Sequence, residues 1–202
     1  ATDRLPRVAA PHEIAGRVTA HAAGATGLPA GTPVAVAGHD HQVAAWAAGV
    51  RRPGDVADSL GTAEAVLGVI AERPDPEHVR TQGMSLVRTV GGVADALVAG
   101  SASAGAMLQH WLATVPADRR DATLAAAAQE ATAEHEPTGA AVAPYLRGRQ
   151  TPDPDPTAIP GRAPAGWPLE KQARAVVEGI CYHARWMIQT QLEPRTPREV
   201  TV

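Results

Sequence analysis

Two short turns carry the side chains in this sequence that could do chemistry. The first, Gly-His-Asp-His at 38–41, follows an apolar run, and the second, Gly61-Thr62, separates two further apolar runs. A carboxylate at the end of a strand can accept a proton from a hydroxyl group. A glycine backbone beside a threonine hydroxyl can hydrogen-bond an anion. The two turns together indicate phosphoryl transfer, which needs both functions.

The first turn predicts an aspartate at the start of a helix. Residues 33–37 are mostly valine and alanine between two glycines, which predicts a buried strand. Asp40 then stands where the unpaired N–H groups of a helix begin, so its carboxylate stays ionised and oriented. An alanine-rich helix follows, and Gly49 ends it. Asp40 is therefore the candidate general base for a substrate hydroxyl.

Two histidines, His39 and His41, flank this aspartate. One interpretation makes them polar filling of a strand-to-helix corner. The other makes them substrate contacts, because an imidazole can donate a hydrogen bond that selects among sugar hydroxyls. Both interpretations stay open at the level of the sequence.

Apolar periodicity predicts a mixed sheet with flanking helices. The strands are expected at 33–37, 56–60, 65–70, 84–89 and 94–98, with a hairpin at Gly61-Thr62. The helices are expected at 11–23, 104–112, 121–134 and 173–192, the last with one apolar stripe that would back the sheet. His183, on the last helix, is interpreted as structural.

A proline-rich stretch, residues 148–168, interrupts this pattern with six prolines. Regular structure is not expected where proline is so frequent. The favoured interpretation is a surface loop with Asp153 and Asp155 in solvent. The alternative is an interlobe or oligomer contact, such as that of a homodimer.

Composition limits the class of protein. The formal net charge of −3 leaves no basic face for nucleic acid. The single cysteine, Cys181, excludes an internal disulfide, fits a reducing and therefore cytoplasmic compartment, and is predicted to be a buried structural thiol. No apolar run is long enough for a membrane span, and the first residues lack a signal-peptide pattern.

The order of these motifs resembles the FGGY family of carbohydrate kinases, within the actin-like ATPase superfamily. The resemblance extends from about residue 11 to residue 192. It is carried by the segments 27–34, 38–41, 49–50, 53–55, 59–62, 104–111, 144–148 and 173–180.

The resemblance implies a fold, a cofactor and a set of site residues. The fold would be α/β, of the ribonuclease H-like actin type, and the activity would be ATP-dependent phosphorylation of a sugar or polyol with Mg²⁺. Asp40 would be the base, and the histidines beside it would contact the substrate. The nucleotide would be bound by Gly61, Thr62, Gly105 and Gln109. The His-Asp-His variant favours fuculokinase-like members over xylulokinase-like ones.

The chain also departs from the family pattern. It reads Gly-Arg-Gln-Thr-Pro at 148–152 where family members usually carry Gly-Glu-Arg, so a role of that glutamate does not carry over. The Asp-x-Gly-Thr-x-x-Lys and Gly-Gly-Gly motifs of the family are absent. The chain is therefore expected to be part of a two-lobed protein. Residues 1–52 would end the N-terminal lobe and 53–202 would form a truncated C-terminal lobe, with the crossing at 51–55.

Two other classes of function remain as alternatives. A metal-dependent hydrolase could use His39, Asp40 and His41, since the two imidazoles would share one face of an extended segment. A further ligand would have to come from another histidine, but none lies in a recognisable metal spacing. These histidines are His12, His21, His78, His110, His135 and His183. The second alternative is a scaffold that kept the fold without the chemistry.

Overall fold

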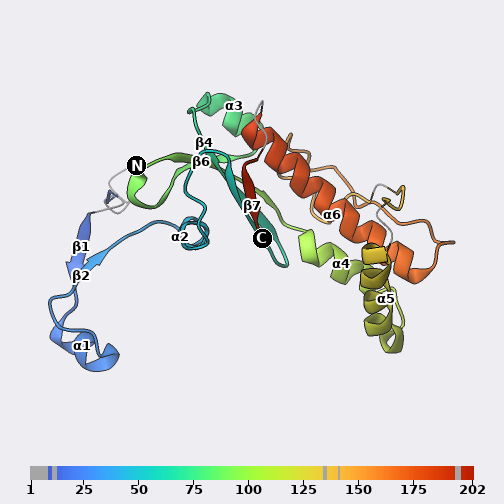
Figure 1. Cartoon of the computed structure of the whole chain (residues 1–202), viewed down its shortest axis with the longest axis horizontal. Coiled ribbons are helices and arrows are strands. Elements are labelled where there is room, and N and C mark those ends of the chain that lie inside the picture. Colours follow the sequence, from blue (N-terminus) through green and yellow to red (C-terminus); the bar gives the residue numbers. More distant parts are fainter. Residues whose placement is uncertain (1–8, 11–12, 134–135, 141, 194–196) are drawn as a thin grey trace.

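The computed structural model of the chain describes residues 9–10, 13–133, 136–140, 142–193 and 197–202. These residues form seven strands and six α-helices (Figure 1). The strands are β1 (Ile14–Arg17), β2 (Pro33–Ala35), β3 (Asp55–Leu60), β4 (Glu64–Ile70), β5 (Ser85–Arg88), β6 (Asp95–Ser101) and β7 (Glu199–Thr201). The helices are α1 (Ala20–Thr26), α2 (Asp40–Ala47), α3 (Pro76–Thr81), α4 (Ala104–Leu112), α5 (Arg120–Ala133) and α6 (Leu169–Leu192).

A five-stranded mixed sheet is the centre of the molecule. Its strand order is β5-β6-β4-β3-β7, and only the pairing of β7 with β3 is parallel among these neighbours. Strand β4 is apolar at almost every position, as expected for a strand that is covered on both faces. The predicted strands 56–60, 65–70, 84–89 and 94–98 correspond to β3 to β6, whereas β7 and α3 were not expected from the sequence.

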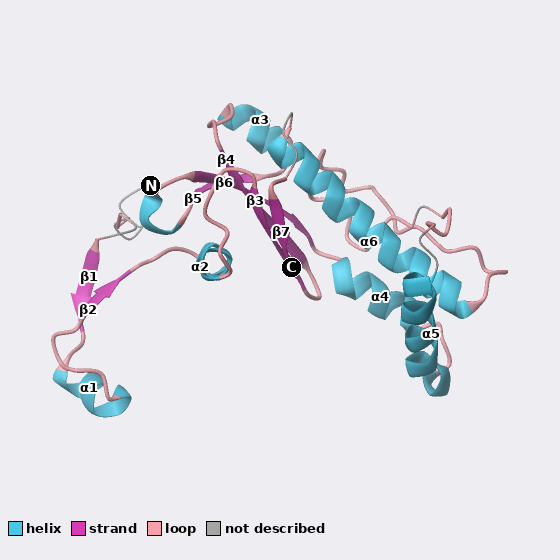
Figure 2. Cartoon of the chain, viewed as in Figure 1, coloured by secondary structure: helices cyan, strands magenta, loops and turns pink. Residues whose placement is uncertain are grey.

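Helices α6 and α2 cover opposite faces of this sheet (Figure 2). On one face Val56 and Val66 pack against Met187 of α6. On the other face Ala45 of α2 packs against Leu67, because successive side chains of a strand point to opposite sides. Farther along α6, a second core joins its residues to α4 and α5. The predicted apolar stripe on α6 therefore serves two cores.

The N-terminal part differs from the prediction of one helix over 11–23. Residues 11 and 12 lie outside the described part, and the rest forms β1 followed by α1. Residues 14–17 form a strand because they pair with β2, and a pairing between two separate segments cannot be read from the local sequence pattern. The predicted strand 33–37 is present as β2, but it is exposed rather than buried, since the two strands form a ribbon without a covering layer among the described residues.

The proline-rich stretch is more firmly packed than a surface loop. Thr151 is 3% exposed, and its hydroxyl donates to the Gly100 carbonyl oxygen and accepts from the Gly100 N–H, each at 3.0 Å. The imidazole Nε2 of the buried His183 lies 2.7 Å from the Thr151 carbonyl oxygen. These contacts hold the start of the stretch to both β6 and α6, so the expectation of a surface loop is wrong at Thr151 and Pro152, whereas residues 153–168 are exposed or half-buried.

Of its two aspartates, Asp153 is exposed as expected and Asp155 is half-buried, but each carboxylate has a hydrogen-bond partner. Asp153 pairs with the Arg149 guanidinium at 3.0 Å. Asp155 accepts hydrogen bonds from the Thr157 N–H and hydroxyl at 2.9 and 2.7 Å. The Arg149 guanidinium also lies over the rings of Tyr145 and Trp186. Side-chain pairing and stacking give order to a segment whose prolines prevent regular structure.

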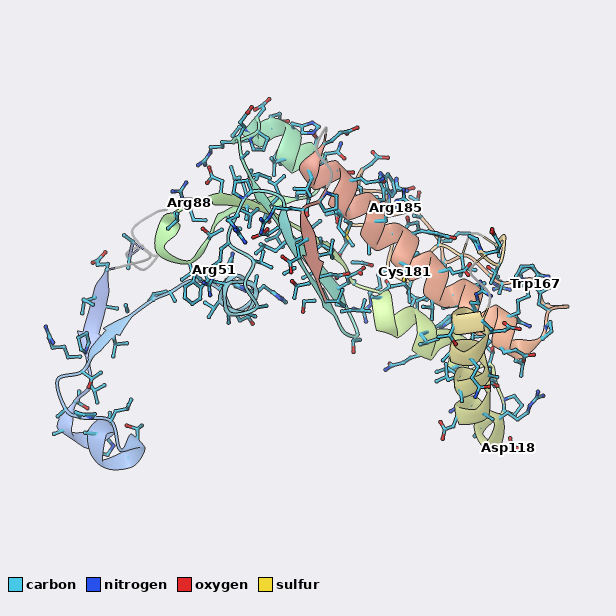
Figure 3. The ribbon with its side chains drawn as sticks, viewed as in Figure 1. Arg51, Arg88, Asp118, Trp167, Cys181 and Arg185 are labelled. Atoms are coloured by element: carbon cyan, nitrogen blue, oxygen red, sulfur yellow. The ribbon has the colours of Figure 1, made fainter. Side chains whose placement is uncertain are left out.

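Two further expectations can be compared with the described residues. Cys181 is exposed on α6, so the prediction of a buried thiol is wrong (Figure 3). The apolar pattern that suggested burial covers the helix face beside it.

Among the described residues, no helix combines the length and hydrophobicity that a membrane crossing requires.

Candidate functional site

The hairpin between β3 and β4 is seated on the first turn of α4. The N–H of Gly105 donates to the Gly61 carbonyl oxygen at 2.9 Å, and the N–H of Ala106 donates to the Thr62 carbonyl oxygen at 3.0 Å. The first N–H groups of a helix have no partner within the helix, and the hairpin backbone supplies these two with acceptors. The hairpin is therefore fixed by a segment more than 40 residues away, while Thr62 itself stays exposed.

Gly105 makes this close approach possible. A Cβ atom at this position would lie 2.5 Å from the Gly61 carbonyl oxygen and 3.2 Å from its carbonyl carbon, so any side chain would displace the hairpin. The structure thus brings together three of the four predicted nucleotide contacts, Gly61, Thr62 and Gly105. Gln109 lies one turn farther along α4 and is exposed.

Asp40 is the first residue of α2, as predicted, and is held by its neighbours in sequence. Its Oδ1 accepts from the His41 N–H at 2.8 Å and lies 2.5 Å from Nδ1 of His39. The two imidazole rings stack with centroids 5.5 Å apart. The side chains of His39 and Asp40 are 67% and 84% exposed, so the first turn presents its carboxylate to solvent.

The two turns share one side of the sheet. A cavity of about 350 Å³ lies between α2 and the strands, and His41 lines it together with Ser59 and Leu60 at the end of β3. His41 therefore faces the strand that leads into the Gly61-Thr62 hairpin. No hydrogen bond between Asp40 and the hairpin is seen among the described residues.

A buried carboxyl pair, Asp58 and Glu64, flanks the hairpin on the other face of the sheet. Glu64 is only 4% exposed, and burial together with the charge of Asp58 and a hydrogen bond from the protonated Glu64 to Asp58 raises the pKa of Glu64 to about 8. Burial also raises the pKa of Asp58. Oδ1 of Asp58 and both carboxyl oxygens of Glu64 have no hydrogen-bond partner outside the pair among the described residues, and a proton held between the two carboxyl groups reduces their repulsion.

Sequence reasoning missed this pair. The available signal was a glutamate at the head of an otherwise apolar strand, two positions after Thr62. Cys181 on α6 lies near these carboxyl groups. Although the residue is exposed, partial desolvation of its thiol, followed by the charges of Glu64, Asp58 and Glu178, raises the pKa of Cys181. This thiol is therefore kept protonated, which makes it a weak nucleophile.

No further metal ligand joins the His39, Asp40 and His41 cluster from the part of the chain that the structure describes. Within the described residues, no group of three or more His, Cys, Asp or Glu side chains could hold a metal ion. His12 and His135, two of the histidines considered for this role, lie outside those residues.

The sequence matches a family model over the part of the chain that contains the hairpin; the match begins after the turn with Asp40. The model described as the C-terminal domain of the FGGY family of carbohydrate kinases matches residues 56–200. The chain belongs to the FGGY family of carbohydrate kinases. Its mixed α/β fold is that of the FGGY kinases, the actin-like ATPase fold. No curated protein matches the chain.

Solved FGGY kinases superpose on most of the chain. A xylulose kinase from Rhodospirillum rubrum is 28% identical, with a TM-score of 0.66 over 90% of this chain and 36% of that one. A xylulose kinase from Lactobacillus acidophilus is 18% identical, with a TM-score of 0.77 over 99% of this chain and 40% of that one. A gluconate kinase from the same organism is 17% identical, with a TM-score of 0.74 over 100% and 41%. The chain thus spans about two-fifths of the length of these kinases.

Proposed function

We propose that this chain is part of an ATP-dependent kinase that phosphorylates a hydroxyl group of a sugar or polyol. The observation that carries the proposal is the hairpin fixed on α4, with Gly61, Thr62 and Gly105 in contact. Membership of the FGGY family supports it. The division into lobes at residues 52 and 53 remains a prediction.

In this proposal, each turn has one role. Asp40 accepts the proton of the substrate hydroxyl while that oxygen forms its bond to the transferred phosphorus and the bond to the leaving ADP breaks. Gly61 and Thr62 contact the phosphate oxygens, with the Thr62 hydroxyl as the donor because the Gly61 N–H is paired with the Ala63 carbonyl oxygen at 2.9 Å. Gly105 and Gln109 lie on the nucleotide side. His39 and His41 orient the substrate.

ATP and Mg²⁺ fit the hairpin by its chemistry. Gly61 leaves the backbone bare, and the exposed Thr62 hydroxyl adds a donor, which suits an anion. When bound, Mg²⁺ would neutralise charge on the phosphate oxygens. We assign it no protein ligand in this chain.

A ketose is the substrate class best supported by the comparisons. The R. rubrum relative, at 28% identity, is a xylulose kinase, while the His-Asp-His motif favours a fuculokinase-like enzyme. A panel of xylulose, fuculose, gluconate and glycerol would separate these candidates by kcat/KM.

A cytoplasmic location and a homodimer remain predictions of the sequence.

The test of the proposed function is Asp40→Asn in the full-length enzyme. We expect turnover to fall by roughly 10²-fold to 10⁴-fold, because the proton loses its acceptor, while ATP binding stays close to wild type. Isothermal titration with a non-hydrolysable ATP analogue and a coupled ADP assay measure the two quantities.

The matched control is Asp118→Asn. Asp118 is exposed in the short turn that precedes α5 (Figure 3), so the same change there should leave turnover intact. Near-normal turnover in Asp40→Asn would contradict the role of Asp40 as the base.

A further inference from the structure

Asp55 has no role in the proposal above, yet its carboxylate is buried and accepts three hydrogen bonds. Asp55 is the first residue of β3 and is 2% exposed. Its Oδ2 accepts from the backbone N–H groups of Arg51 and Arg52 at 3.1 and 2.9 Å, and its Oδ1 accepts from Nε of Arg198 at 2.8 Å. One side chain thus joins the connector before β3 to the residue that precedes β7.

Asp55 stays ionised under physiological conditions. Burial alone would raise its pKa, but the hydrogen bonds from Arg198, Arg52 and Arg51 outweigh burial and lower the pKa of Asp55 to about 2. The guanidinium of Arg52 lies 4.0 Å from the same carboxylate. These interactions are therefore present throughout the pH range in which an enzyme of this kind works.

The connector between α2 and β3 has no free backbone donor. Gly49 and Val50 donate to Trp46 and Ala45, Gly54 donates to Val69, and Asp55 donates to Arg52. The N–H groups of Arg51 and Arg52 go to the Asp55 carboxylate, and Pro53 has none. Because each of these backbone N–H groups has an acceptor, the connector forms a rigid link between α2 and β3.

Side chains of the connector reinforce the link to α2. Nε of Arg51 donates to the Trp46 carbonyl oxygen at 3.1 Å, and its guanidinium lies 4.0 Å from the centre of the Trp46 ring. Figure 3 shows Arg51 directly beside α2. Val50 is buried in the same core as Ala45 of α2 and Leu67 of β4. Helix α2 is therefore attached to the sheet by the connector as well as by its own packing.

We propose that Asp55 is a positioning residue that makes α2 and β3 a single rigid body, so that Asp40 and Thr62 keep a fixed separation during turnover. This inference rests on the proposed function of Asp40 and Thr62. It moves the bending point of the chain from 51–55, where the sequence placed the lobe crossing, to the segment before Asp40. Residues 36–39 of that segment have no regular structure and are exposed, and Gly38 has a φ of 153°.

The test is Asp55→Asn in the full-length enzyme, with two measurements. Hydrogen exchange of the Arg51 and Arg52 amides should accelerate by roughly tenfold or more, because their charged acceptor is lost. The kcat should fall by roughly tenfold or more while the KM values for ATP and sugar change less than about threefold, because misplacement of reacting groups weakens the transition state more than the ground state.

Asp95→Asn is the matched control. Asp95 also begins a strand and is 14% exposed at its side chain, but its ion-pair partners, Arg88 at 2.9 Å and Arg73 at 3.5 Å, do not belong to the connector. This variant removes a comparable ion pair and should leave kcat and the two amides unchanged. If Asp55→Asn does not fold, Arg198→Gln removes one of the three bonds from an arginine that is 46% exposed and should give the same changes at smaller size.

The outcomes separate this inference from the proposed function. Faster exchange at Arg51 and Arg52 without a fall in kcat beyond that of Asp95→Asn would overturn the positioning role. Unchanged exchange would overturn the rigid link itself, whatever the activity. Failure of the proposed function would instead appear as full turnover in Asp40→Asn.

Discussion

The two turns of the site are built in different ways. The hairpin at Gly61-Thr62 is held by α4, a segment distant in sequence, through backbone hydrogen bonds and a contact that only glycine allows. Asp40, by contrast, is held by His39 and His41 beside it, and its side chain is 84% exposed. The hairpin, which is the phosphate side of the proposed site, is therefore tied to the tertiary fold, whereas Asp40, the base side of the proposed site, is held only by its own turn. Substitutions on the two sides should therefore affect different quantities.

The largest effect on stability is expected for Gly105→Ala. Alanine normally favours a helix over glycine by about 0.5–1 kcal/mol, but here its Cβ would meet the Gly61 carbonyl oxygen. We expect the free energy of unfolding to fall by about 1–3 kcal/mol and the KM for ATP to rise, because the hairpin must shift. Urea denaturation and initial-rate kinetics measure both effects. Gly166→Ala, in open space, is the control, and equal stability of the two variants would remove the distinction between the two turns.

An intermediate, pH-dependent effect is expected for Glu64→Gln. The pKa of Glu64 is about 8 in the folded protein and 4.5 in its usual state, so the unfolded chain releases its proton first. Stability of the wild type should fall as pH rises from about 4.5 to about 8, and the variant should lack this slope. Denaturation midpoints across that range provide the measurement. Glu199→Gln, exposed on β7, should keep the wild-type slope, and a variant at position 64 that also kept it would argue against the shared proton.

The smallest effect on stability is expected for Asp40→Asn. Its side chain makes contacts only within its own turn, so the free energy of unfolding should change by less than about 0.5 kcal/mol, even though turnover is lost. The same denaturation experiment tests this. A loss comparable with that of Gly105→Ala would show that the base side is also part of the core.

The local sequence pattern was sufficient to predict two central strands of the sheet and two of the helices. Strands β3 and β4 are apolar runs separated by a Gly-Thr pair, and α4 and α6 have a helical apolar stripe, so these were predicted. Strand β7 was not, because three residues gain their strand conformation only by pairing with β3, far away in sequence. The ribbon of β1 and β2 was missed for the same reason.

The residues of the site also differ in whether the sequence alone could reveal them. Asp40, Gly61, Thr62 and Gly105 stand in motifs, and the motifs could be recognised from the sequence. The roles of Asp55 and of the Asp58 and Glu64 pair depend on burial, which is produced by the assembled sheet and the elements that cover it. The packing of Thr151 against Gly100 was hidden in the same way, because prolines around it indicate only the absence of regular structure.

The parallel pairing of β7 with β3 has a consequence for biosynthesis. A ribosome produces β3 early and Glu199–Thr201 late, so β3 must remain an unpaired sheet edge while all the intervening segments are made. An open strand edge invites pairing with other chains. Strand β3 ends in Asp58, Ser59 and Leu60, and its aspartate is a residue type that is poorly suited to such intermolecular strands. This aspartate therefore disfavours intermolecular pairing at the open edge of β3 until β7 is made.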